Sequence, residues 1–165
     1  KKSEETPEMI LKLSNLLDYL LYQVDKPWVS LNEELEHIKD YVALENMRFS
    51  DTLNVSMNFD HIDSTVLIAP MLLIPFVENS FKHGQIRNRK LTIMMDLYHE
   101  SDTITFNIKN SIHPMPTNDT EGIGLSNIKK RLSTIYPDNH DLDIIQNNEW
   151  YIIQLRLNTI KTTNL

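Results

Sequence analysis

The order of apolar periodicities along this chain sets the strongest limit on its fold. Two stretches with helical spacing come first, and after residue 51 the pattern changes to strand, helix, two strands, polar loop, helix and two strands. Strand pairs separated by single helices indicate an α+β fold of two layers, with a mixed sheet and helices on one of its faces. The sequence contains no internal repeat and no low-complexity linker.

Helical spacing dominates residues 1–50, which we predict to be a helical segment distinct from residues 51–165. A first amphipathic helix is expected over 7–23, with an apolar stripe from Met9 to Leu21. Ser30 and Glu33 have the spacing of a capping box, which predicts that a second helix begins there and runs to about Arg48.

Strand-like alternation begins after Asp51, where Leu53, Val55, Met57 and Phe59 alternate with polar residues. Pro70 is expected to open a helix that reaches about Lys82 and ends at Gly84. The remaining expectations are strands over 90–98 and 103–109, a loop over 110–121, a helix ending before Pro137, and strands over 142–146 and 150–157.

Composition excludes several classes of function. The formal net charge is −7, which disfavours nonspecific binding to nucleic acid. Cysteine is absent, so the chain has no disulfide framework and no thiolate chemistry. No apolar run approaches the roughly 18–20 residues that a membrane helix needs. The chain begins with Lys1 instead of Met, so we expect it to be a fragment of a longer protein.

Two clusters carry polar residues suited to phosphate chemistry. On a helix, Glu78, Asn79, Lys82 and His83 share roughly one face, and an amide oxygen with a nearby cation suits a metal-bound phosphate. By pattern alone, the same residues also fit a polar helix end that is capped by Gly84.

The second cluster contains two of the three glycines of the chain, Gly122 and Gly124, directly before a predicted helix. Glycines at this position let phosphate oxygens approach the N–H groups at the positive end of the helix. A lone G-x-G is also common in turns, and Lys129–Arg131 also fits a solvated helix face.

Together, and in this order, the clusters resemble a known superfamily. Residues 78–84 resemble the N box of the GHKL ATP-binding superfamily, and Gly122-Ile123-Gly124-Leu125 resembles its second glycine box. Residues 31–49, 70–75 and 127–137 resemble the LytS-type sensor histidine kinases within it, so the resemblance covers nearly the whole chain.

The resemblance implies an ATP-binding kinase core that uses ATP and Mg²⁺. Asn79 would ligate Mg²⁺, Lys82 and His83 would contact phosphates, and Glu78 would orient Asn79 or the attacking histidine. Residues 110–121 would form a mobile lid over the nucleotide. The further nucleotide-binding residues implied are Asn110, Gly122, Gly124, Leu125 and Asn127.

The resemblance also implies what surrounds this core. Residues 1–50 would be a remnant of the dimerisation and phosphoacceptor region, with the acceptor histidine outside the chain. The full-length protein would be a homodimer at the inner membrane, reaching that membrane only through the missing N-terminal region. This part would be cytoplasmic, would act on a cognate response regulator and would not bind nucleic acid.

Two departures from the family pattern leave an alternative open. The first glycine box of the family supplies an aspartate that accepts from the adenine amino group, and Asn110 stands in its place without the glycines that follow. His37 precedes the core but lies outside any acceptor motif, and we expect a surface or packing role for it. A degenerate nucleotide-sensing or protein-interaction module without turnover is the alternative.

Related ATPases and anti-sigma kinases carry a general-base Glu one helical turn before the metal-binding Asn. Pro75 occupies that position here and cannot act as a base. Phosphoryl transfer to a histidine is therefore favoured over hydrolysis or serine phosphorylation, because the imidazole acceptor is already nucleophilic.

Overall fold

The computed structural model describes residues 26–59, 63, 65–113 and 123–159, together with four isolated positions near the N-terminus. Those four positions, Pro7, Ile10, Leu11 and Ser14, are helical, and Ile10 and Leu11 are exposed. The rest of the helix expected over 7–23 lies outside the described residues, and its apolar stripe stays a prediction.

A five-stranded mixed sheet forms the centre of the fold, in the order β2-β4-β5-β7-β6. Its strands are β2 (Leu53–Phe59), β4 (Leu91–Glu100), β5 (Thr103–Ser111), β6 (His140–Gln146) and β7 (Trp150–Asn158). β2 pairs with β4 in parallel, and the other neighbours pair antiparallel. Two short strands, β1 (Val29–Ser30) and β3 (Leu67–Ile68), form a separate antiparallel pair.

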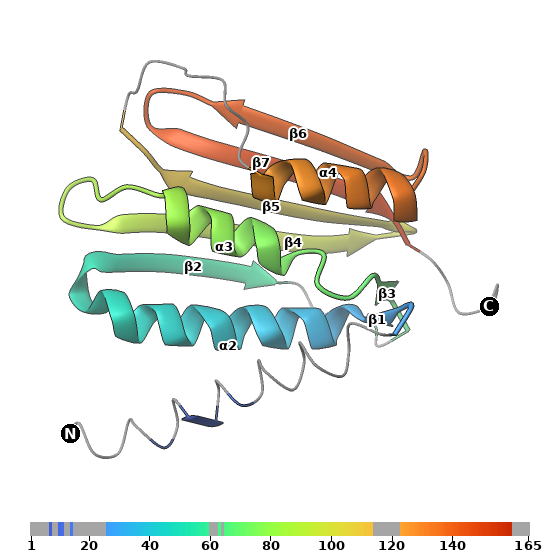
Figure 1. The fold of residues 1–165 in the computed structure, drawn as a ribbon, viewed down its shortest axis with the longest axis horizontal. Coiled ribbons are helices and arrows are strands. Elements are labelled where there is room, and N and C mark those ends of the chain that lie inside the picture. The colour runs from blue at the N-terminus through green and yellow to red at the C-terminus, as the bar shows by residue number, and fades with distance from the viewer. Residues whose placement is uncertain are drawn as a thin grey trace.

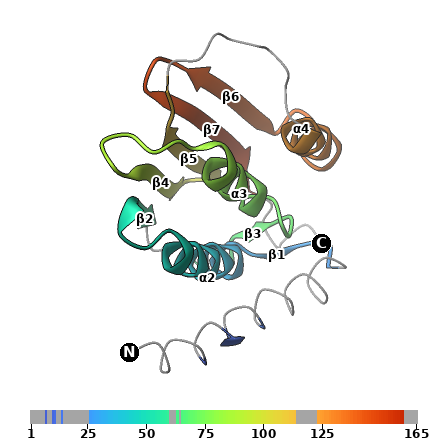
Figure 2. The same ribbon diagram turned by 60° about the vertical axis from the view of Figure 1, so that its left-hand side comes forward.

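Three helices cover one face of this sheet, as Figures 1 and 2 show from two directions. They are α2 (Leu31–Phe49), α3 (Ile74–His83) and α4 (Ile123–Ile135). The strands alternate accordingly, so that Ile93 and Met95 in β4 and Phe106 in β5 are buried against the helices. The predicted two-layer α+β architecture, a mixed sheet with helices on one face, is confirmed.

Helix α2 begins where its capping box predicted. The Ser30 N–H donates to Oε2 of Glu33 at 3.1 Å, and the Ser30 hydroxyl accepts from the Asn32 N–H at 3.3 Å. The apolar stripe of α2 packs into the same hydrophobic core as the sheet and the other helices. Whether 1–50 and 51–165 are separate domains stays a prediction, although α2 contributes to the core of the second part.

The expected start of α3 at Pro70 is wrong, because the helix begins at Ile74. Met71 has a φ of 58°, in the left-handed region, and this breaks helical continuity after Pro70. The helical proline is instead Pro75 in the first turn of α3, where a missing N–H is tolerated. A short 3-10 turn, η1 (Ser50–Thr52), joins α2 to β2.

Candidate functional site

Three elements carry the predicted site residues, and α3 contacts both of the others. In Figure 1 the C-terminal ends of α3 and β5 lie on the left, the start of α4 lies nearer the middle, and α3 and α4 run in opposite directions. Both helices lie on the same face of the sheet, and both contribute buried side chains to one core. The fold therefore packs α3, which ends at His83, against α4, which begins only at Ile123.

Helix α3 presents its predicted residues toward solvent and keeps an apolar face in the core. Asn79 is half-buried, whereas Glu78, Lys82 and His83 are exposed. Although Glu78 as a whole residue is exposed, its carboxyl is partly desolvated, which raises the pKa of that carboxyl, and the Glu45 carboxylate on α2 raises it further. A partly desolvated acid next to a half-buried amide is thus available on the face predicted to hold Mg²⁺.

Asn110 lies at the end of β5, close to the end of α3. Its side chain is 1% exposed, and its Oδ1 atom has no hydrogen-bond partner among the described residues. Its Nδ2 atom would lie 3.4 Å from a Cβ placed on Gly84, and that Cβ would lie 2.4 Å from the Ser80 carbonyl oxygen. Gly84 therefore allows α3 to end directly against the buried amide.

Gly84 ends α3, as predicted, but for a different reason from a left-handed cap. Its φ and ψ are −62° and 147°, an extended conformation that any residue adopts. Its N–H closes the helix by donating to the Ser80 carbonyl at 3.0 Å. Close packing against Ser80 and Leu91 is what requires glycine here.

The glycine box lies at the start of α4. Gly122 is outside the described residues, and Gly124 is exposed, with no atom of the described residues within 4 Å of a Cβ placed on it. Asn127 is exposed, whereas the Leu125 side chain is 8% exposed and packs into the core. None of the described residues therefore blocks a ligand that approaches the positive end of α4 at Gly124.

The segment expected to be a loop over 110–121 begins later than predicted. Asn110 and Ser111 are strand residues that pair with Tyr151 and Trp150 of β7. Ile112 is buried, and its N–H donates to the Glu149 carbonyl at 2.9 Å. Within the expected loop, the described residues 110–112 are thus fixed by the sheet, and residues 114–121 lie outside the described part.

Sequence reasoning missed two charged residues that shape the start of α3. Glu34 of α2 is 0% exposed and accepts hydrogen bonds from backbone N–H groups that lead into α3. Arg131 of α4 donates to the Met71 carbonyl at 2.7 Å. The position of Glu34 among the apolar residues of α2 was the signal available in the sequence.

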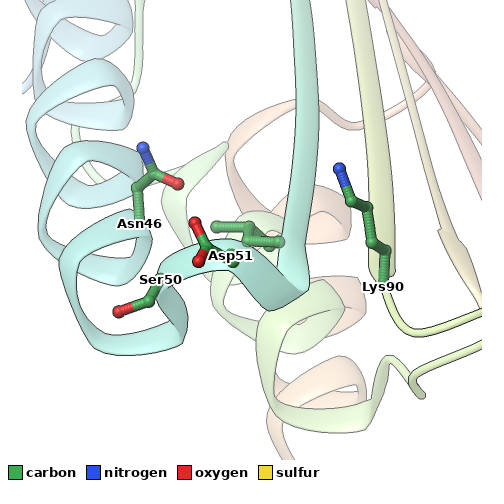
Figure 3. A pocket seen from close by; sticks show the side chains of 5 residues that line it. Asn46, Ser50, Asp51 and Lys90 are labelled. Atoms are coloured by element: carbon green, nitrogen blue, oxygen red, sulfur yellow. The ribbon is translucent and has the colours of Figure 1, made fainter.

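A shallow surface pocket lies elsewhere, between the end of α2 and the starts of β2 and β4 (Figure 3). Its walls come from Asn46, Ser50, Asp51, Leu53 and Lys90. None of these is a predicted site residue, and the pocket contains a single carboxylate, so it does not alter the location of the candidate site.

Within the described ranges, no three His, Cys, Asp or Glu residues are grouped so as to hold a metal ion. Mg²⁺ does not require such a cluster, because it commonly binds through one or two protein oxygens and substrate phosphates. The amide oxygen of Asn79 suits this mode. No helix in the described part of the chain is long and apolar enough to span a membrane.

Several known proteins are similar to this chain in sequence or in fold. The family described as Histidine kinase matches residues 1–53. Sensor protein LytS of Staphylococcus saprophyticus is 27% identical over 134 residues, which are 80% of this chain and 22% of LytS. Sensor protein kinase HptS of Staphylococcus aureus is 36% identical over 77 residues, which are 47% of this chain and 15% of HptS.

Solved histidine kinases share the fold at low sequence identity. The histidine kinase domain of the blue-light activated kinase from Erythrobacter litoralis superposes with a TM-score of 0.62 at 14% identity, covering 89% of this chain and 74% of that domain. Histidine kinase ThkA, in complex with the response regulator TrrA, gives a TM-score of 0.61 at 14% identity, covering 93% of this chain and 49% of ThkA. These likenesses establish the fold alone.

The chain has the fold of solved histidine kinase domains, and the histidine kinase family model matches its N-terminal residues 1–53. By sequence the chain is similar to LytS sensor proteins over about four fifths of its length at 27% identity, and this similarity supports the kinase core of a LytS-type sensor histidine kinase. The chain spans 22% and 25% of the length of two LytS relatives that it matches.

Proposed function

We propose that this chain binds Mg-ATP as the catalytic core of a two-component sensor histidine kinase and transfers the γ-phosphoryl group to a histidine outside the chain. The observation that carries the proposal is the Oδ1 atom of Asn110, which is buried and has no partner among the described residues. A buried acceptor without a partner is costly, and a ligand that donates to it would remove the cost.

Adenine is the ligand group that fits this acceptor. The exocyclic amino group of adenine donates hydrogen bonds, and the amide oxygen of Asn110 would accept one as the family aspartate does. Because Asn110 is neutral, recognition would depend on hydrogen-bond direction and not on charge. Helix α3 ends at Gly84 close to the Asn110 side chain, so it would form one wall of the adenine site.

The phosphate end of ATP would lie between α3 and the start of α4. Asn79 would ligate Mg²⁺, while Lys82 and His83 would contact phosphate oxygens and Glu78 would orient Asn79 or the incoming histidine. Gly122, Gly124, Leu125 and Asn127 would hold the phosphates or the base of the lid at the positive end of α4. Bound Mg²⁺ would neutralise charge that develops during phosphoryl transfer.

The wider assembly follows from the same proposal. The parent protein would dimerise and pass its phosphoryl group to a response regulator. The structural neighbour ThkA is described in complex with a response regulator, which supports this kind of partner. A membrane attachment would lie in another part of the parent protein.

Calorimetric titration with Mg-ATP tests the site with a control in the same strand. Asn110 and Asn107 both belong to β5, both have an Oδ1 atom without a partner among the described residues, and they face opposite sides of the sheet. Asn110→Ala should weaken Mg-ATP binding about tenfold, the effect of losing about 1.4 kcal/mol. Asn107→Ala should leave the affinity unchanged, and equal affinities in both variants would contradict the proposal.

Labelling with γ-labelled ATP tests the reaction. We expect the 165-residue chain to bind Mg-ATP and to incorporate no stable label, because the acceptor is proposed to lie outside it. The intact parent should acquire an acid-labile phosphoryl group. ATP binding without labelling of the intact parent would favour the nucleotide-sensing alternative.

A further inference from the structure

Residues 69–73, which connect β3 to α3, are held by side chains from two other helices. The Ala69 N–H donates at 2.9 Å to the hydroxyl of Tyr136, the residue that follows the end of α4. Met71 has a φ of 58°, a left-handed conformation that non-glycine residues rarely adopt. Such a conformation persists where the surrounding structure holds it in place.

Both backbone hydrogen-bonding groups of Met71 are bound by charged side chains. Its N–H donates to Oε2 of Glu34 at 2.9 Å, and its carbonyl accepts from Nη1 of Arg131 at 2.7 Å. Arg131 also donates through Nη2 to the neighbouring Pro70 carbonyl. A carboxylate from α2 thus binds the N–H of this residue and a guanidinium from α4 binds its carbonyl, and we call this arrangement the Met71 clamp.

Glu34 also caps α3 from outside the helix. The N-cap residue Leu73 makes no side-chain cap, and Pro75 in the first turn has no N–H to donate. Oε1 of Glu34 accepts from the Leu73 N–H at 2.9 Å and from the Ile74 N–H at 3.4 Å. A carboxylate at this end also interacts favourably with the helix dipole.

The Met71 clamp connects the two helices that carry the proposed nucleotide site. Asn79 lies on α3, whose start is bonded to Glu34, and Gly124 lies on α4, which also carries Arg131. Leu132, next to Arg131, is 0% exposed, so this part of α4 is fixed in the core. A shift of α4 along the sheet would therefore pull on the segment that sets where α3 begins.

We propose that Glu34 and Arg131 are positioning residues, which fix the Mg²⁺-binding helix α3 relative to the glycine-box helix α4 through the backbone of Met71. The inference rests on the proposed nucleotide site. It implies that Mg²⁺ and the phosphates meet a preset spacing of the two helices. If Glu34 and Arg131 served fold stability alone, their replacement would not change how Mg²⁺ affects ATP binding.

Two conservative substitutions weaken the clamp while they preserve size or charge. Glu34→Gln replaces one acceptor oxygen with an NH₂ group that faces a backbone N–H. Arg131→Lys keeps the charge but loses the planar fork that reaches two carbonyls. Ile38→Val is the matched control, because Ile38 is 0% exposed on α2 and its lost methylene lowers stability without touching the clamp.

The ratio of ATP affinity with and without Mg²⁺ is the first measurement, made by calorimetry at a temperature where each variant is folded. Glu34→Gln and Arg131→Lys should each lower this ratio at least about fivefold, the lower end of typical coupling between sites. Ile38→Val should leave it unchanged. The double variant should be no worse than the larger single effect, because both residues act through Met71. An unchanged ratio in both clamp variants would overturn the inference.

Amide hydrogen exchange gives a second measurement that needs no nucleotide. The Leu73 and Ile74 N–H groups bond to Glu34 and not to Arg131. Faster exchange at these two amides in Arg131→Lys than in Ile38→Val supports transmission through Met71, and equal exchange refutes it. A wild-type chain that binds no Mg-ATP would overturn the proposed function, while this exchange result would still decide the clamp.

Discussion

At the residue scale, two glycines have different surroundings, because Gly84 is closely packed and Gly124 is not. A Cβ at Gly84 would lie 2.4 Å from the Ser80 carbonyl oxygen and 2.5 Å from Cδ1 of Leu91, whereas a Cβ at Gly124 meets no described residue within 4 Å. Gly84→Ala should therefore lower the free energy of unfolding by about 1–3 kcal/mol, the usual cost of overpacking. Gly124→Ala should leave stability equal or about 0.5–1 kcal/mol higher, since alanine favours the helix.

Urea unfolding and Mg-ATP calorimetry on the two glycine variants check this expectation. If phosphates approach α4 at Gly124, then Gly124→Ala should weaken Mg-ATP binding although the fold is intact. A Gly84→Ala variant as stable as wild type would show that α3 can move away from β4 at no cost.

Tyr136 makes the stability of the fold sensitive to alkaline pH. Its side chain is 2% exposed, and burial raises the pKa of its phenol to about 12 from an ordinary value of about 10. The folded state therefore holds this proton more tightly than the unfolded state does. The resulting stability is complete below pH 10 and is lost between about pH 10 and 12, by up to roughly 1.4 kcal/mol per pH unit.

Tyr136→Phe should flatten this alkaline loss, measured as the free energy of unfolding at several pH values. At neutral pH the variant should be about 1 kcal/mol less stable, because the Ala69 N–H loses its acceptor. Burial also raises the pKa of Tyr41, so part of the alkaline loss should persist in this variant. An alkaline profile identical to that of wild type would show that the Tyr136 phenol ionises equally easily in both states.

Buried polar residues are where sequence reasoning failed at this scale. Glu34 follows Leu31 by three positions and precedes Ile38 by four, so it lies on the buried face of α2. The sequence shows that Glu34 lies on this face, but it does not show which groups its carboxylate binds, namely N–H groups of residues 71–74. Asn110 was identified only through the family resemblance, since nothing in its local pattern marks a buried amide.

At the scale of elements, the sequence predicted the helices and strands whose positions depend on neighbouring residues. The capping box predicted the start of α2, period-two alternation predicted β2, and the other strands of the main sheet were also expected close to their observed positions. The strand pair β1–β3 was missed because two-residue strands have no periodicity and form only when distant segments pair. The start of α3 was misplaced because Pro70 suits a first helical turn, whereas contacts from α2 and α4 hold Met71 in a left-handed conformation.

At the scale of the whole molecule, α2 is as much a part of the core as the sheet. Four of its apolar side chains are buried, namely Leu31, Leu35, Ile38 and Val42. Each contributes about 1.5–3 kcal/mol on burial. Their sum is comparable to the roughly 5–15 kcal/mol that stabilises an entire domain. A division of the chain at residue 50 would therefore remove the buried side chains of α2 from the core that they help to form.

We predict that a chain of residues 26–165 unfolds in one cooperative transition and that residues 51–165 alone do not. Without α2, the buried faces of α3 and β2 would be exposed, and the Leu73 and Ile74 N–H groups would lose the Glu34 carboxylate. Circular dichroism melting and the dispersion of amide NMR signals measure both chains. A sharp melting transition for residues 51–165 would instead support two domains divided at residue 50, with α2 as a helix that docks on a completed fold.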